Sequence, residues 1–304
     1  MTPLRDALAN YLSLRRSLGY KLHRSEKLLG QFIDFLEARA ARTITTENAL
    51  AWACQSPHAS VNWRSNRLSA VRVFANHLHA VDAATEVPPK DLLPWRSSRA
   101  SPYLYSQQEI AALMEAASRL ASPLRAATYQ TLIGLLAVTG IRVGEAVGLD
   151  RHDFNAEQRV LLVRHAKFNK TRELPLHPTT AATLGRYLAC WHGQRKATDA
   201  LFISTAGTRL LYCNVQLTFQ QLTRQAGLSA RTSRCRPRIH DLRHAFAVSA
   251  LLDAYREASD IDQRLTLLST YLGHVNPAAT YWYLSAAPEL LAKAAERLER
   301  GAAP

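Results

Sequence analysis

The sequence predicts a mainly α-helical protein with a small β-sheet, divided into two domains. Three observations support this fold class. The N-terminal part carries apolar side chains at helical spacing, residues 82–102 are rich in proline and serine, and the remainder mixes apolar helices with one pair of strand-like runs. A length of 304 residues suits one large domain or two ordinary ones.

The first domain, residues 1–84, is expected to be a bundle of four helices. Four apolar stripes follow one another at intervals of three and four residues. Gly19 separates the first apolar stripe from the second, and Thr45 or Thr46 can cap the third helix. Helices of this length can share one apolar core, with their basic residues left off the stripes.

Residues 85–102 are expected to be a linker. Pro88, Pro89, Pro94 and Pro102 prevent a continuous helix there. A proline- and serine-rich stretch between two apolar regions is typical of a domain boundary.

The second domain, residues 103–304, is expected to combine helices with a short hairpin. Ser106 and Glu109 have the spacing of a capping box at a helix start. The apolar run 129–138 predicts a buried helix. Runs 160–163 and 173–176 predict two strands joined by a polar turn.

The chain is strongly basic, with a formal net charge of +14 and a pI of about 10.0. Such a charge favours a polyanionic partner, most often nucleic acid, although a generally basic composition is the ordinary alternative. The four cysteines form no Cys-x-x-Cys pair, so neither a zinc site nor a redox motif is supported. Without a signal peptide or a membrane-spanning run, we expect a cytoplasmic protein with reduced thiols.

Six side chains could together attack a phosphodiester. In chain order they are Arg142, Lys167, His240, Arg243, His274 and Tyr283. Two of them, His240 and Arg243, are three residues apart and share a face of the predicted helix. Taken singly, each has an ordinary explanation, such as an ion pair of Arg142 with Glu145 or an aromatic packing role for Tyr283.

The motifs that carry these residues resemble the tyrosine recombinase (phage integrase) family. They are TGIRVGE at 139–145, HDLRH at 240–244 and LGH at 272–274, followed by Tyr283. Lys167 fits the hairpin lysine of the family. The resemblance covers the whole second domain, and the helical first domain fits the SAM-like core-DNA-binding domain of the family.

The resemblance implies a site-specific recombinase that cuts and rejoins DNA through a 3′-phosphotyrosyl intermediate and a Holliday junction. Tyr283 is then the nucleophile, with Tyr281 as the rival. A phenol must lose its proton during attack, and His240 can accept it. Arg142 and Arg243 offer planar forks for phosphate oxygens.

The remaining groups complete this chemistry. His274 is expected to donate a hydrogen bond to a phosphate oxygen, and Lys167 to protonate the leaving 5′-oxygen. Supporting, orienting roles are expected for Glu145, Asp241 and His244. No cofactor is expected, because the phosphotyrosyl bond conserves energy without ATP and two guanidiniums replace a metal.

The implied partner is double-stranded DNA with short inverted core sites. Side chains expected to touch it are Arg15, Arg16, Lys21, Arg24, Arg64, Arg67 and Arg72 in the first domain, and Lys170, Arg231, Arg234, Arg236 and Arg238 in the second. The family works as a tetramer on paired sites, and a second recombinase could take part. An amphipathic helix at about 286–300 is expected to pack on a neighbouring protomer, with packing in cis as the alternative.

Two departures narrow the resemblance. The segment between Leu252 and Leu272 is longer than in simple members. We also expect no arm-binding domain before residue 1. The second feature favours an Xer-like or transposon-borne recombinase for integration, excision, transposition or dimer resolution. Alternatives are a type IB topoisomerase-like enzyme, which uses the same groups on one duplex, and a non-catalytic DNA-binding protein on the same fold.

Overall fold

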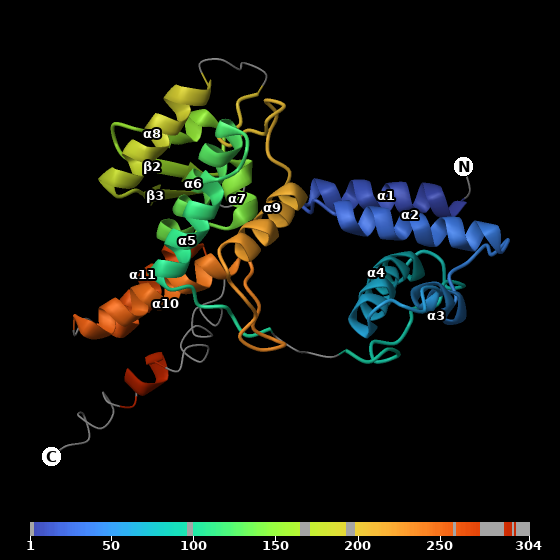
Figure 1. The fold of residues 1–304 in the computed structure, drawn as a ribbon. Helices are drawn as coiled ribbons and strands as arrows, with labels where there is room; N and C mark the ends of the chain where they lie inside the picture. Colours follow the sequence, from blue (N-terminus) through green and yellow to red (C-terminus); the bar gives the residue numbers. More distant parts are fainter. Residues whose placement is uncertain are drawn as a thin grey trace. The chain divides into compact units, whose positions relative to one another are not determined.

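The structure, a computed structural model, describes residues 3–95, 100–164, 171–192, 198–257, 260–273, 289–293 and 295. The chain separates into two compact units, residues 1–99 and residues 100–304 (Figure 1). The described parts of both units are mainly helical, and the second unit holds a three-stranded sheet. The predicted fold class is therefore confirmed.

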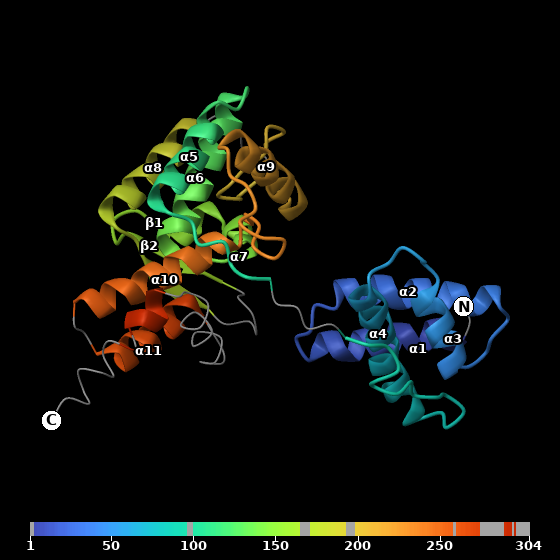
Figure 2. The same ribbon diagram turned by 60° about the horizontal axis from the view of Figure 1, so that its bottom comes forward.

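The first unit is the expected bundle of four helices. They are α1 (Pro3–Ser17), α2 (His23–Ala38), α3 (Thr46–Cys54) and α4 (Val61–His79). Helices α1 and α2 lie side by side in both ribbon views (Figures 1 and 2). Gly19 turns the chain between them with a φ of 86°, and the side chain of Thr45 caps α3 by accepting a hydrogen bond from the Asn48 N–H. Phe32 and Trp52 pack at 5.2 Å between ring centroids in the buried core.

The segment expected to be a linker, residues 85–102, is held against the first unit along its first part. Arg72 of α4 donates hydrogen bonds of 2.7 Å to the carbonyl oxygens of both Pro88 and Pro89. Thr85 is buried. The prolines do end the helical region, but this part of the segment belongs to the folded unit rather than to a free linker.

The second unit is built around α6. Its helices are α5 (Gln107–Ser118), α6 (Pro123–Thr139), α7 (Val143–Gly148), the 3₁₀ turn η1 (Arg151–Asp153), α8 (Pro178–His192), α9 (Tyr212–Gln225), α10 (Asp241–Arg256) and α11 (Ile261–Leu272). Helix α6 packs against α5, α8 and α10. Both ribbon views place α10 and α11 together at one end of this unit, with α8 toward the other (Figure 2). None of the described helices is long and apolar enough to span a membrane.

The sheet contains the predicted hairpin. Its antiparallel strands are β1 (Phe154–Asn155), β2 (Val160–Val163) and β3 (Arg172–Pro175), in that order. The register pairs Val163 with Arg172 at the end of the hairpin that carries its turn. Strand β3 therefore starts one residue earlier than expected.

The second unit is anchored near both of its ends, at the start of α5 and close to the C-terminus. Ser106 and Glu109 form both hydrogen bonds of the predicted capping box at the start of α5. Leu290, in the short helical stretch 289–293 near the C-terminus, is fully buried in the apolar cluster formed by α10 and α11, with Leu251 and Leu268. This stretch thus packs in cis within the single chain, and packing of the helix on a neighbouring protomer stays a prediction.

Candidate active site

Arg142 lies at the junction of α6 and α7. Gly140 ends α6 with a φ of 60°, and a Cβ there would lie 2.5 Å from the Phe246 ring, so only glycine fits. Arg142 then takes an extended conformation as the N-cap of α7. Its backbone N–H donates to Glu145 Oε2 at 3.1 Å and its Nη1 donates to Oε1 at 2.8 Å. The expected Arg142–Glu145 pair is present, with the carboxylate in the first turn of α7, where the helix dipole favours it.

The Glu145 carboxylate also holds a second arginine, Arg172 at the start of β3. Arg172 Nη2 donates to Oε2 at 2.8 Å and Nη1 to Oε1 at 3.3 Å. The Glu145 side chain is only 8% exposed. Burial alone would raise the pKa of this carboxyl, but hydrogen bonds and charges from Arg172 and then Arg142 outweigh it and lower the pKa. Glu145 is therefore an ionised anchor between two guanidiniums.

Three arginines meet at the C-terminal end of α11. Arg172 Nε donates to the carbonyl oxygen of residue 271 at 3.0 Å, Arg243 Nη2 to that of residue 272 at 2.7 Å, and Arg142 Nη2 to that of residue 273 at 3.3 Å. The last carbonyls of a helix have no partner within it, and its dipole is negative there. The end of α11 thus gathers these cations just before position 274.

The site carries more positive than negative charge. Arg142 and Arg172 share the Glu145 carboxylate, whereas Arg243 donates to the carbonyl oxygens of Gly140 and Leu272. Arg243 is buried, and the Arg142 side chain is the more exposed, at 28%. Backbone carbonyls solvate guanidiniums but do not neutralise them. Such a cluster is suited to bind an anion that approaches from the side of Arg142.

His240 lies at the surface directly before α10, whose first turn also holds Arg243. Partial burial of the ring lowers its pKa, and the positive charge of Arg243 lowers it further. The negative charge of Asp241 raises the pKa of His240, and the positive charge of Arg142 lowers it. The His240 ring is therefore kept in its neutral form, which can accept a proton.

Asp241 and His244 lie behind this surface. Asp241 is fully buried and accepts two hydrogen bonds from Arg238, at 2.8 and 2.9 Å. His244 Nε2 lies 3.8 Å from Asp241 Oδ1, and its ring meets that of His240 edge-on at 5.0 Å between centroids. These contacts fit the supporting roles expected for both residues, and they give Arg238 a structural partner.

The structure thus brings together Arg142, His240 and Arg243 of the predicted catalytic set. The other three lie outside the described residues: Lys167, His274 and Tyr283. The rival nucleophile Tyr281 and the expected phosphate contact Lys170 lie outside them too. Their roles stay predictions.

Arg172 was not among the site residues predicted from the sequence. Strand β3 alternates, with Arg172 and Leu174 turned inward and Glu173 exposed. A charged residue on the inward face of a strand needs a buried partner. That alternation is the signal that could have singled it out.

Several cations expected on DNA have partners inside the first unit. Arg67 is the clearest departure, because it is buried, with its guanidinium 3.9 Å from the Trp52 ring centroid. Arg64 donates to the carbonyl of Pro57 at 2.6 Å, and Arg72 to the proline carbonyls given above. The sequence placed these three off the apolar stripe but could not show the tertiary contacts.

The remaining expected cations of this unit lie nearer to solvent. Arg15 and Arg24 stack on aromatic rings, those of Tyr20 and Trp63. Arg16 pairs with Glu26, and Lys21 is exposed.

In the second unit, the arginines that precede His240 in the sequence also divide into residues with partners in the protein and residues exposed to solvent. Arg231 donates to the Leu104 carbonyl at 3.0 Å and stacks on the Tyr103 ring at 4.3 Å. Arg234 and Arg236 are exposed. These two are the cations of this segment that fit a phosphate contact most directly.

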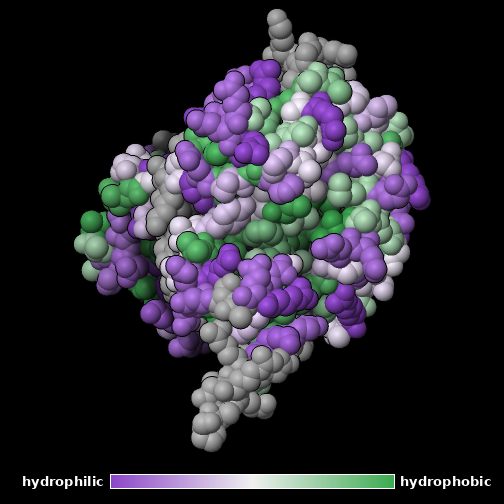
Figure 3. Space-filling view, turned by 90° about the vertical axis from the view of Figure 1, so that its left-hand side faces the viewer, coloured by the Kyte–Doolittle hydropathy of each residue, from purple (hydrophilic) through white to green (hydrophobic). Residues whose placement is uncertain are grey.

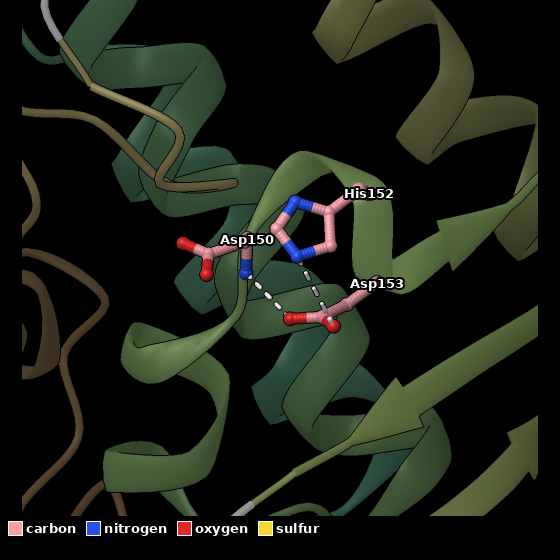
Figure 4. Close-up of side chains that lie close together, drawn as sticks. All are labelled: Asp150, His152 and Asp153. Carbon is pink, nitrogen blue, oxygen red and sulfur yellow. Dashed lines mark hydrogen bonds and ion pairs between the residues drawn. The ribbon is translucent and has the colours of Figure 1, made fainter.

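A cluster of Asp150, His152 and Asp153 has the composition of a metal site (Figure 4). Its carboxylates are already used. Asp153 accepts a hydrogen bond of 2.8 Å from the Asp150 N–H, as a cap of η1, and lies 2.7 Å from Arg164 Nε. Asp150 pairs with Arg209. Arginine partners on both carboxylates favour a structural cap over a cation site.

A cavity of about 490 Å³ lies between α5, α6 and α8. Its lining is mostly apolar and includes Met114, Val138 and Trp191. Figure 3 shows one face of the molecule, where apolar side chains gather in a hollow bordered by hydrophilic ones. No described residue of the arginine cluster lines the cavity, so it is separate from the candidate active site.

Comparisons with known proteins agree with this geometry. Residues 104–289 match the model of the phage integrase family. The chain is 43% identical over 310 residues to the "Putative integrase/recombinase y4rB" of Sinorhizobium fredii, covering 99% of this chain and 98% of that protein. It is 31% identical over 216 residues to tyrosine recombinase XerC of Azotobacter vinelandii, covering 71% and 67%.

The fold has a counterpart among solved structures. The integrase of transposon Tn1549, in complex with transposon right end DNA, superposes with a TM-score of 0.66 at 17% identity over 100% of both chains. At that identity the likeness speaks for the fold, while the family match and the sequence relatives establish the membership. The chain belongs to the phage integrase family and is a tyrosine recombinase, an enzyme of DNA recombination.

Proposed function

We propose that this chain is a site-specific recombinase in which Tyr283 cuts and rejoins DNA strands through a covalent 3′-phosphotyrosyl intermediate. The observation that carries the proposal is the convergence of Arg142, Arg172 and Arg243 on the end of α11, where two of the guanidiniums share a single carboxylate. The transition state of phosphoryl transfer develops further negative charge, which prearranged cations stabilise. His274, a further proposed catalytic residue, directly follows Gly273 in the sequence.

In the first step, the Tyr283 oxygen attacks the scissile phosphorus and the bond to the 5′-oxygen breaks. His240 takes the phenolic proton, and its lowered pKa keeps it neutral and ready to do so. Lys167 gives a proton to the departing 5′-oxygen. Arg142 and Arg243 hold the non-bridging oxygens, and His274 donates a further hydrogen bond to one of them.

In the second step, a 5′-hydroxyl from another strand attacks the phosphotyrosine and releases Tyr283. The proton transfers run in reverse, and the number of phosphodiester bonds is conserved. Two rounds exchange both strand pairs through a Holliday junction. The working form is a tetramer on paired, inverted core sites of double-stranded DNA, with the C-terminal helix joining protomers.

The experiment uses nicked suicide duplexes from DNA flanking the gene that encodes the chain, incubated with purified protein. The expected product is a protein–DNA adduct that survives denaturant, is lost in Tyr283→Phe and is retained in Tyr281→Phe. Tight binding without any adduct would overturn the proposal in favour of a non-catalytic DNA-binding protein. Paired sites then separate strand exchange from the relaxation of a single duplex, which a topoisomerase-like enzyme would perform.

A further inference from the structure

We propose that Arg172 is a positioning residue for strand transfer, which acts by fixing Glu145 and the end of α11 in one arrangement. The inference rests on the proposed function and assigns a role to a residue outside the six that would carry the chemistry. The Arg172 guanidinium has three nitrogens. Each of them donates to the protein: Nη1 and Nη2 to Glu145, and Nε to the Tyr271 carbonyl oxygen.

These contacts argue against a direct phosphate contact for Arg172. The Arg172 side chain is 13% exposed, and each of its three nitrogens already donates a hydrogen bond within the protein. Arg142 differs, because its side chain is 28% exposed while it shares the same carboxylate. The contacts of Arg172 thus lead to Glu145 and to the backbone at residues 271–273, and through both of these it can position the groups that hold the phosphate.

The first route runs from Arg172 through Glu145 to Arg142. The carboxylate accepts from the side chains of both arginines and from the Arg142 N–H. Without Arg172, Glu145 keeps one guanidinium partner and loses the bidentate contact that fixes its plane. The Arg142 fork then loses a rigid support. A displacement of about 1 Å at such a group costs on the order of 100-fold in rate.

The second route runs from Arg172 to the end of α11. Gly273 follows α11 with a φ of 68°, and its missing Cβ would lie 3.0 Å from Arg172 Nη1. The guanidinium thus packs closely against Gly273, the residue directly before His274 in the sequence. Arg172 also begins β3, at the hairpin end whose turn carries Lys167 in the sequence. One side chain therefore ties together three stretches that each contribute a proposed catalytic group.

The chain offers a matched control in Arg209. That arginine also joins a carboxylate, Asp150, to carbonyl oxygens near a helix end, those of Val147 at 2.9 Å and Leu149 at 3.0 Å. It has the same kind of contacts as Arg172 but bonds to none of the proposed catalytic groups. Replacing it measures what the loss of an ordinary structural clamp does to the enzyme.

The test compares Arg172→Gln, Arg172→Lys, Glu145→Gln and Arg209→Gln with the wild type. Circular dichroism and DNA affinity are measured first, and then the single-turnover rate of adduct formation on the nicked duplex. Arg172→Gln should bind DNA within about threefold of wild type and lose about 100-fold in rate. Arg209→Gln should unfold more easily yet form the adduct at the wild-type rate. The lysine variant, which keeps the charge without the fork, should lie between them and carries the test if Arg172→Gln does not fold.

A double variant, Arg172→Gln with Glu145→Gln, distinguishes positioning from general destabilisation. If both residues act through their shared contact, the double variant should be no slower than the worse single variant. The positioning role would be overturned if the rate losses of the two single variants multiplied in the double variant, or if Arg172→Gln were no slower than Arg209→Gln. Neither result would contradict the proposed function. A wild-type chain that forms no adduct would instead refute the proposed function, and the positioning role with it.

Discussion

Arg243 donates a hydrogen bond of 2.7 Å to the carbonyl oxygen of Leu272, the last residue of α11. Its other terminal nitrogen donates at 2.7 Å to the carbonyl of Gly140, the C-cap of α6. One buried cation therefore joins the C-terminal ends of two helices that are far apart in the sequence. Helix dipoles favour a cation at both ends, and the carbonyls would otherwise lack partners.

Arg243→Ala should destabilise the fold as well as stop catalysis. It leaves two buried carbonyl groups unsatisfied, which lowers the free energy of unfolding by on the order of 3 kcal/mol. Arg243→Lys should lose less, because it keeps a charge but cannot span both carbonyls. Urea denaturation of the three proteins checks this. An Arg243→Ala variant as stable as wild type would mean that the hydrogen bonds of Arg243 to the two helix ends do not contribute to the free energy of unfolding.

Gly273→Ala should harm both stability and strand cleavage. The positive φ of 68° costs a non-glycine residue about 1–2 kcal/mol, and the new Cβ also presses on Arg172. Gly227→Ala is the matched control, since it has a φ of 69° and no atom within 4 Å of the added Cβ. Denaturation should show a larger loss of unfolding free energy for Gly273→Ala than for Gly227→Ala. Only Gly273→Ala should slow adduct formation. Equal effects of the two substitutions would show that the contact with Arg172 is unimportant.

Adduct formation should persist in mildly acidic solution. The pKa of His240 is lowered from the ordinary histidine value of about 6.5 by partial burial and by Arg243, so more than half of the rings are neutral at pH 6.5. The rate should fall only when the pH drops through this lowered pKa and the proton acceptor becomes charged. A single-turnover rate profile from pH 5 to pH 8 measures it. An acid limb with its midpoint above 6.5 would contradict the proposed base.

Salt dependence should separate surface cations from buried ones. Arg236→Gln should reduce the slope of log affinity for DNA against log salt by about 0.9, the value for one phosphate contact. Arg67→Gln should leave that slope unchanged and lower the free energy of unfolding instead, because Arg67 is buried against Trp52. Fluorescence anisotropy over a salt series gives both slopes. An unchanged slope for Arg236→Gln would remove it from the DNA-binding set.

Local patterns predicted much of this molecule. The capping box of Ser106 and Glu109, the pairing of Arg142 with Glu145, and the hairpin at β2 and β3 all depend on residues close together in the sequence. Helical spacing, capping and strand alternation act over a few residues, and they are legible without a structure.

Contacts between distant residues were not predictable in the same way. Arg172 and Glu145 are separated by 27 residues, and Arg142 and Gly273 by 131. The sequence likewise placed Arg67 and Arg72 off the apolar stripe, but their partners lie on other elements of the first unit. A charged residue off a stripe can face solvent or an adjacent element, and only the packing of elements decides between them.

The covalent attachment of Tyr283 to DNA is tested by locating the modified residue. The denatured adduct is digested with nuclease and trypsin, and the modified peptide is fragmented in a mass spectrometer. No lysine or arginine lies between Arg264 and Lys293, so one tryptic peptide contains both Tyr281 and Tyr283. We expect the residual nucleotide on Tyr283. A nucleotide on Tyr281, or on any residue outside this peptide, would contradict it.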